Sequence, residues 1–251
     1  MAASAAVAPR PASALAIGMA LAAVYLIWGS TYLGIRFALE GGWPAMLGVS
    51  GGRMLVAGAL LFAVLRLRGV PSPTRAQWPT LAVMGLLMML LGNGMVVLAE
   101  KEVSSGLVLL LIAPIAWAFG SVWSRGRDLP SPFMAAAAQM LCGGVMLIAL
   151  GLSSGEHWPA APTAHGTAAL VYLALFGSIA GFGAYIWLLH HVRPALAGSY
   201  AYVNPPIAVL LGAWLGGEHF SLHDLGAMGV ILVGVVAISR AKARATAGPS
   251  R

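Results

Sequence analysis

The sequence predicts an all-α membrane protein, a polytopic helical bundle of about eight transmembrane helices, and three observations support this prediction. Hydrophobic residues make up 60% of the chain and charged residues only 8%, whereas a soluble domain carries about 25% Asp, Glu, Lys and Arg. The apolar residues form long stretches separated by short linkers, and the basic residues lie in alternate linkers. Too few charges are present to cover a surface that faces water, so a soluble fold is excluded.

Eight apolar stretches are long enough to be membrane spans. A helix needs about 20 apolar residues to cross a hydrocarbon core about 30 Å thick. Since backbone groups in lipid must be paired within the segment, we expect each span to be a helix. The expected spans are Leu15–Ile35, Met46–Leu65, Trp78–Leu98, Ser105–Trp123, Met134–Leu152, Ala168–Leu189, Ala195–Leu215 and Leu222–Ser239. No linker between them is long enough for a soluble domain.

The distribution of basic residues predicts the orientation of these spans. With the N-terminus in the cytoplasm, the inner segments hold eleven Lys and Arg residues, and the outer segments hold only Arg36 and Lys101. Membrane proteins keep their positive loops inside, so we expect a multi-pass protein of an inner membrane with both termini cytoplasmic. The net charge of +7 does not indicate a nucleic-acid partner, because binding nucleic acid requires a basic patch and these residues are spread singly between spans.

Arg53 is the only basic residue inside an expected span. An intramembrane charge is a candidate functional residue. The alternatives are that its side chain reaches the membrane surface, or that it pairs with carbonyl groups at a broken helix.

Aromatic, amide and hydroxyl groups at depth in the other spans are further candidates for a binding site. Such groups suit a small amphipathic molecule, although each ring could also simply pack between helices. The candidates for lining a substrate cavity, together with Arg53, are Trp28, Thr31, Asn93, Trp117, Ser121, Tyr185, Tyr202 and Asn204.

Glycines and prolines within the spans predict irregular helices. We expect the third span to break at Gly92-Asn93-Gly94, since transporters place broken helices around their substrate. The pairs Gly48 with Gly52 and Gly177 with Gly181 allow helices to approach closely. The sequence does not decide whether these pairs serve packing within the bundle or the interface of a homodimer.

Signals for an enzyme are absent from the sequence. His190 and His191 are adjacent at a helix end without an acidic or cysteine partner, whereas zinc sites commonly space their histidines by three to five residues. No phosphate loop, HExxH or GxSxG motif is present. We therefore expect no catalytic residues, no metal and no cofactor, and an intramembrane enzyme is disfavoured.

An internal repeat relates the two parts of the chain. The segment from Trp28 to Arg36 is similar to that from Trp117 to Arg125, and Gly92 and Gly94 match Gly181 and Gly183 at the same offset of 89 residues. Duplicated halves are frequent in transporters.

The chain resembles the EamA-type permeases of the drug/metabolite transporter superfamily, and within them the YedA-like group of inner-membrane transporters. The segments that carry the resemblance are Ile27-Trp28-Gly29-Ser30-Thr31-Tyr32, Gly92-Asn93-Gly94-Met95, Ala116-Trp117-Ala118-Phe119-Gly120-Ser121-Val122, Leu173-Ala174-Leu175-Phe176-Gly177-Ser178, Ser199-Tyr200-Ala201-Tyr202-Val203-Asn204-Pro205, and Leu215-Gly216-Gly217-Glu218 with Gly226 and Gly229. The resemblance implies a fold of ten helices, arranged as two inverted five-helix repeats around a central cavity.

Because only eight spans are present, this chain looks like a remnant of that ten-helix fold. Roughly fifty residues of a usual member are missing near residues 103–116. The expected domains are an incomplete first repeat (1–106), a second repeat (107–240) and a basic cytoplasmic tail (241–251). The resemblance implies a secondary transporter that exports small metabolites or amphipathic compounds by alternating access. The alternative is a non-transporting membrane protein that has lost transport with the missing helices.

Overall fold

The structure, a computed structural model, describes residues 12–101 and 106–217 together with residues 226 and 229, except for the side chains of residues 106–111, 194, 195, 201 and 202. It confirms the predicted all-α fold, because every element in these ranges is a helix. Helical segments occupy the positions of the first seven predicted spans, and the eighth prediction, Leu222–Ser239, lies outside the described residues. Five helices within the described part are long and apolar enough to cross a membrane.

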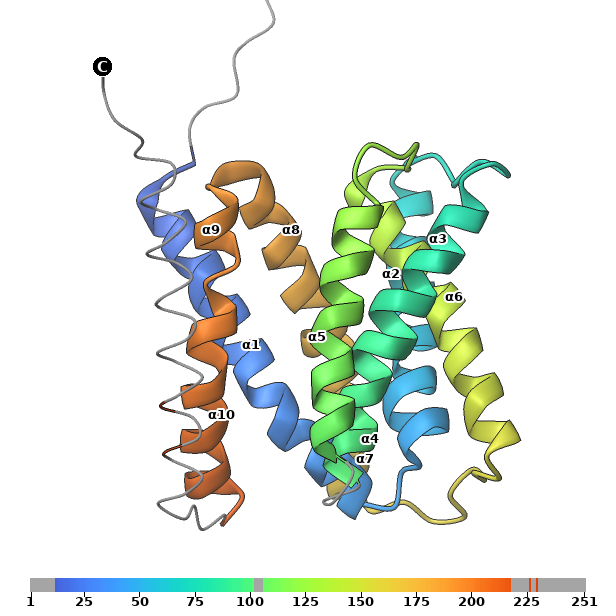
Figure 1. The fold of residues 1–251 in the computed structure, drawn as a ribbon, viewed down its shortest axis with the longest axis vertical. Coiled ribbons are helices and arrows are strands. Elements are labelled where there is room, and N and C mark those ends of the chain that lie inside the picture. The colour runs from blue at the N-terminus through green and yellow to red at the C-terminus, as the bar shows by residue number, and fades with distance from the viewer. Residues whose placement is uncertain (1–11, 102–105, 218–225, 227–228, 230–251) are drawn as a thin grey trace, which may run out of the picture.

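The first half of the chain forms four helical segments (Figure 1). The first, α1 (Ala14–Glu40), begins after Ser13, whose side chain accepts a hydrogen bond from the Ala16 amide. The other elements are η1 (Ala45–Gly52) with α2 (Arg53–Leu67), α3 (Trp78–Met84) with η2 (Gly85–Gly94) and α4 (Met95–Lys101), and α5 (Gly106–Trp123). The backbone is helical across α5 although Pro114 lies inside it.

The second half continues with α6 (Pro132–Ser153). The elements that follow are α7 (Ala164–Tyr172) with η3 (Leu173–Ala180) and α8 (Gly181–His191), the short α9 (Pro194–Ala197), and α10 (Tyr200–Leu215). The predicted seventh span is thus divided into α9 and α10, and α10 remains helical through Pro205 and Pro206.

Three segments, η1, η2 and η3, are π-helical. The prediction of a break at Gly92-Asn93-Gly94 was wrong, because the third span continues from η2 directly into α4. A π-helix widens the turn so that each amide reaches a carbonyl five residues back, which keeps the backbone paired while it shifts the helix face. Pairing of this kind is required within a membrane.

The two halves of the chain interlock around α2 and α6. Within the bundle, α2 packs against α6 and η3, while α1 packs against α7, α8 and α10. A methyl group on Gly58 of α2 would lie 3.1 Å from the Leu141 nitrogen of α6, and one on Gly144 would lie 3.0 Å from the Leu55 nitrogen. These two contacts are reciprocal, because each glycine meets the leucine that lies three residues before the glycine of the other helix. Glycine at both positions allows the two backbones to meet.

Contacts between loops close the end of the bundle at which α1 finishes (Figure 1). The Glu156 carboxylate accepts hydrogen bonds from the amides of Met46 at 2.9 Å and Leu47 at 2.8 Å, at the start of η1. A helix N-terminus offers unpaired amides and a partial positive charge, so a carboxylate stabilises it.

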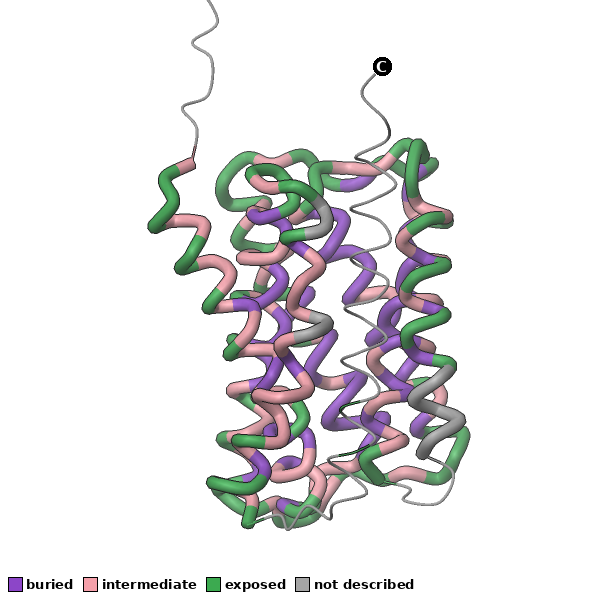
Figure 2. Tube along the Cα trace, turned by 60° about the vertical axis from the view of Figure 1, so that its left-hand side comes forward, coloured by how far each residue is buried: buried purple, intermediate pink, exposed green. Residues whose placement is uncertain are grey.

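Burial is greatest where helices of both halves meet. Figure 2 shows buried residues on the inward sides of the helices, whereas residues 14–23 of α1 are all exposed or half-buried. The principal core cluster joins residues of α1, α2, η2, α6 and η3. Ile35, Met54 and Phe182 of this cluster also line a cavity.

Candidate functional site

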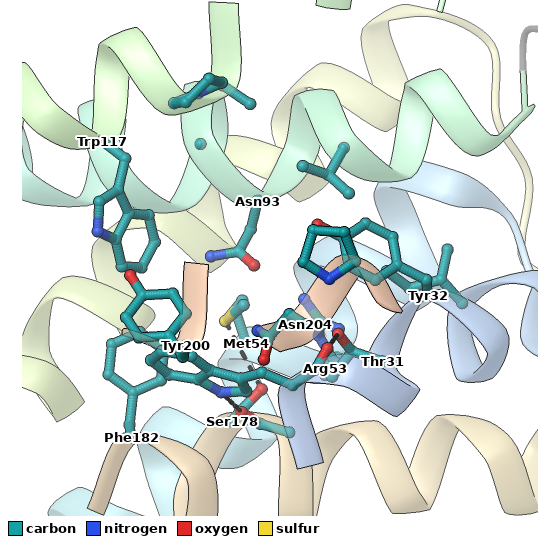
Figure 3. Close-up of a pocket in the computed structure, with 18 of the residues that line it drawn as sticks. Thr31, Tyr32, Arg53, Met54, Asn93, Trp117, Ser178, Phe182, Tyr200 and Asn204 are labelled. Atoms are coloured by element: carbon teal, nitrogen blue, oxygen red, sulfur yellow. Dashed lines mark hydrogen bonds between the residues drawn. The ribbon is translucent and has the colours of Figure 1, made fainter. Parts of the chain in front are cut away.

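A cavity of about 420 Å³ lies between helices of both halves of the chain. Its walls come from α1, the junction of η1 and α2, η2, α4, α5, η3, α8 and α10 (Figure 3). A volume of this size is typical of small-molecule sites.

Six of the nine residues predicted to line a cavity border this one: Trp28, Thr31, Arg53, Asn93, Trp117 and Asn204. They come from five different spans, so the fold brings together groups that are up to 176 positions apart in the sequence. Their role in binding stays a prediction.

Of the other three predicted residues, two do not line the cavity and the third has no described side chain. Ser121 lies one turn beyond Trp117 and donates a hydrogen bond to the Trp117 carbonyl at 2.8 Å, so its hydroxyl is used within α5. Tyr185 packs behind the cavity wall, with its ring 5.3 Å from that of Trp28 and 5.5 Å from that of Tyr200. Tyr202 belongs to α10, but its side chain lies outside the described part of the structure.

Several lining residues were missed by the sequence reasoning. Tyr200 is the clearest case, because it precedes Asn204 by four residues and therefore shares its helix face. Helical periodicity would have found it. Phe182 and Ser178 carry no comparable signal, since they lie at the end of η3 and the start of α8, where π-helical turns change the periodicity.

The position of Trp28 depends on the π-helix η3. The Gly181 amide donates to the Phe176 carbonyl, five residues back, and is therefore not available to Gly177, its partner in an α-helix. The Trp28 indole Nε1 donates to that Gly177 carbonyl at 3.1 Å. A side chain of α1 thus donates to a carbonyl whose usual α-helical donor is engaged elsewhere, and this hydrogen bond fixes the ring at the cavity wall.

Aromatic rings form one continuous side of the cavity. The Trp28 ring lies 4.7 Å from Tyr200 and 5.5 Å from Phe182, both edge to face, and Phe182 lies 5.9 Å from Trp117. Such arrangements are worth about 0.5–1.5 kcal/mol per pair beyond the burial of the rings. Trp28 and Trp117 are the residues that the internal repeat matches, and both contact Phe182.

Two strongly polar side chains border the cavity with atoms that have no hydrogen-bond partner among the described residues. They are Arg53, through its Nε, and Asn204, through its Oδ1; the exposed fractions of the two residues are only 4% and 8%. Figure 3 shows both side chains in the same part of the pocket, near Thr31 and Ser178. The Asn93 amide nitrogen, at the opposite wall, is 3.4 Å from the Met88 carbonyl within its own helix.

Comparison with known proteins identifies the chain's relatives. The EamA-like transporter family matches residues 14–111 and again residues 104–240, so two copies of the family's unit cover nearly the whole bundle. No solved structure matches the chain significantly.

The chain is also similar to the protein named "Uncharacterized inner membrane transporter YedA" in Escherichia coli strain K12, strain CFT073 and serotype O157:H7. Each of the three is 39% identical over 278 aligned positions, which include 89% of this chain and 90% of the relative. Because 89% of 251 residues is about 223, about 55 aligned positions have no residue in this chain. This number agrees with the predicted shortening of roughly fifty residues.

Proposed function

Because the chain belongs to the EamA-like transporter family, whose relatives here are named inner-membrane transporters, we propose that it is a secondary transporter that exports small metabolites or amphipathic compounds across the inner membrane by alternating access. The observation that supports this proposal is the cavity, in which aromatic rings and a few polar groups from several helices converge. Trp28 lies 14 residues into α1, about 21 Å along a helix that rises 1.5 Å per residue.

Alternating access requires two groups of helices that can move relative to each other around the site. Among the helices that line the cavity, α1 packs against α8 and α10, and η2 packs against α5. The π-helical segments η2 and η3 line the cavity, and η1 ends directly before Arg53, which also lines it. π-helical turns of this kind often occur at functional positions. We propose that these segments accommodate the movement. We also propose that residues 1–106 form an incomplete first repeat, residues 107–240 the second repeat and residues 241–251 a cytoplasmic tail.

The alternative function is that of a membrane protein that no longer transports. The observation that favours it is the absence of about 55 positions present in each relative. The two functions differ in one measurable property, the movement of a solute.

A comparison of cavity variants in cells tests the proposal. Cells that express the chain should release metabolites that cells with Trp28→Ala retain, as measured by mass spectrometry of the medium. Trp214→Ala is the matched control, because Trp214 of α10 is 80% exposed and remote from the cavity. Uptake of the released compounds into everted vesicles should then separate export from indirect effects. Identical media from the chain, Trp28→Ala and cells without the chain would support the non-transporting alternative.

A further inference from the structure

Arg53 is a buried cation whose charge is not balanced within the described part of the chain. It forms no salt bridge among residues 12–101 and 106–217. Three of the described acidic residues are engaged elsewhere: Glu40 pairs with Arg36, Asp128 accepts from Gln77, and Glu156 accepts from the start of η1. An unpaired charge in a low-dielectric interior is strongly destabilising, so its presence at a cavity wall points to a charge that arrives with a ligand.

Asn204 adds a second requirement for the ligand, a hydrogen-bond donor. Within the part of the chain that the structure describes, its Oδ1 is an acceptor without a donor, and Asn204 borders the same cavity from α10, in the other half of the chain. A buried acceptor left unpaired is destabilising, because it has given up its hydrogen bonds to water. The ligand that satisfies both groups therefore carries an anion for Arg53 and an N–H or O–H donor for Asn204.

The rest of the wall defines the body of the ligand. Trp28, Trp117, Phe182 and Tyr200 present ring faces and edges, and Met54, Ile35 and Val96 are apolar. Aromatic and apolar walls bind an apolar or aromatic group. One guanidinium carries one charge and a planar fork of donors that matches a carboxylate in two parallel hydrogen bonds.

We propose that the cavity binds a small organic acid, with its carboxylate on Arg53, a hydroxyl or amino donor on Asn204, and an aromatic or apolar body among the four rings. Transport of this acid rests on the proposed function, whereas its binding does not, because binding can be measured without transport. It narrows the substrate class to monoanions that are amphipathic.

The test uses a matched ligand series on the purified full chain in detergent, by isothermal titration calorimetry. Phenyllactate carries the ring, the hydroxyl and the carboxylate; its reduced diol lacks only the anion, and hydrocinnamate lacks only the hydroxyl. We expect the diol to bind at least about tenfold more weakly than phenyllactate, in line with hydrogen bonds to charged groups. Hydrocinnamate should bind more weakly by a smaller factor. These comparisons need no variant, so they do not depend on the folding of a mutant.

Variants then assign the preference to Arg53. Arg53→Met should bind phenyllactate and the diol equally, whereas Arg66→Met, which removes a charge from the exposed end of the same helix, should keep the preference for the acid. The inference is overturned if the diol binds the unmodified chain as tightly as phenyllactate, if Arg53→Met keeps the preference, or if no member of the series binds.

Vesicle uptake separates this inference from the proposed function. Acid-selective binding without phenyllactate uptake would support the site and contradict the transporter. Uptake of a neutral or cationic solute, with no acid-selective binding, would support the transporter and contradict the carboxylate site.

Discussion

At the residue scale, the site depends on contacts that leave no room for a larger side chain beside Trp28. A methyl group on Gly181 would lie 2.5 Å from the Trp28 Nε1, the atom that donates to the Gly177 carbonyl. Gly181 therefore allows the indole to approach the start of α8. A methyl group on Gly183, one half-turn further along the same helix, would meet only the Phe133 ring, at 3.8 Å.

The first prediction compares these two glycines. Gly181→Ala should displace Trp28 and break its hydrogen bond to Gly177, and overpacking of this kind costs about 1–3 kcal/mol. We expect a lower thermal midpoint in detergent and a loss of phenyllactate binding, whereas Gly183→Ala should behave like the unmodified chain. A Gly181→Ala protein with unchanged midpoint and unchanged binding would show that Trp28 is not held in this way.

The sequence identified those site residues whose chemistry stands out against an apolar span. Arg53 is the one embedded cation, and Trp28 and Trp117 are matched by the repeat. Tyr200 belongs with these candidates, because the period of 3.6 residues places it on the same face as Asn204. The Tyr202 side chain lies outside the described residues, so Tyr202 stays a prediction. Phe182 could not be selected, because one phenylalanine among many apolar residues carries no distinguishing signal.

At the element scale, close contact between helices holds the bundle together. Lipid chains are as apolar as leucine, so association in a membrane relies on packing and not on removal from water. The reciprocal contacts of Gly58 and Gly144 lie where α2 and α6 cross. By contrast, a methyl group on Gly18 of α1 would have no neighbour within 4 Å.

The second prediction follows from this contrast. Gly144→Leu should force α2 and α6 apart, because even a methyl group would lie 2.8 Å from the Leu55 side chain and 3.0 Å from its nitrogen. We expect a lower thermal midpoint and a loss of monodispersity by size-exclusion chromatography in detergent. Gly18→Leu is the control and should change neither. Equal behaviour of the two variants would mean that this crossing does not limit stability.

The positions of the helices could be predicted, but their internal geometry could not. Span length and apolar runs determine where a helix lies, and seven predicted spans coincide with helices within the described residues. The π-helical turns have no such signature, because a span that is apolar on all sides looks the same at either period. The sequence therefore predicts a break at Gly92, Asn93 and Gly94, whereas the backbone stays helical through η2.

At the scale of the whole molecule, the distribution of charges predicts the orientation in the membrane. Gly69 and Gly126 lie in loops at the end that holds most of the basic residues, and Gly155 and Gly217 lie at the opposite end. All four have positive φ angles and no atom within 4 Å of an added methyl group, so these turns have space for an inserted reporter.

The third prediction is the topology that these loops report. Reporter fusions at Gly69, Gly126 and the C-terminus should give a cytoplasmic signal, and those at Gly155 and Gly217 an outer signal, since positive loops stay inside. Paired alkaline phosphatase and fluorescent protein fusions measure both outcomes. A cytoplasmic signal at Gly155 would contradict the predicted arrangement of eight spans.

One helix face in the bundle is exposed and apolar at the place where the repeat predicts a covering helix. α10 of the second half packs against α1 of the first half: a methyl group on Gly29 would lie 2.6 Å from Ile207, and Leu33 is buried. The repeat matches these residues to Ala118 and Val122 of α5, and there Val122 is 61% exposed, with Phe119 and Ile115 also exposed. We infer that the face of α5 formed by Ile115, Phe119 and Val122 is the one that the absent helices cover in the longer relatives.

The fourth prediction tests this inference by restoring the absent segment. Cys142 is the single cysteine, so Cys142→Ala gives a background in which Phe119→Cys can carry a fluorescent label. Lipids with brominated chains should quench this label in the present chain, because the face contacts lipid. Inserting the roughly 55 extra residues of the Escherichia coli relative near Gly106 should protect it, since a helix packed on α5 excludes lipid. A label at Val145 of α6, which is 59% exposed, is the control and should stay quenched in both chains. If quenching at Phe119 is the same in the two chains, the missing helices pack elsewhere, and the site of the deletion lies outside the start of α5.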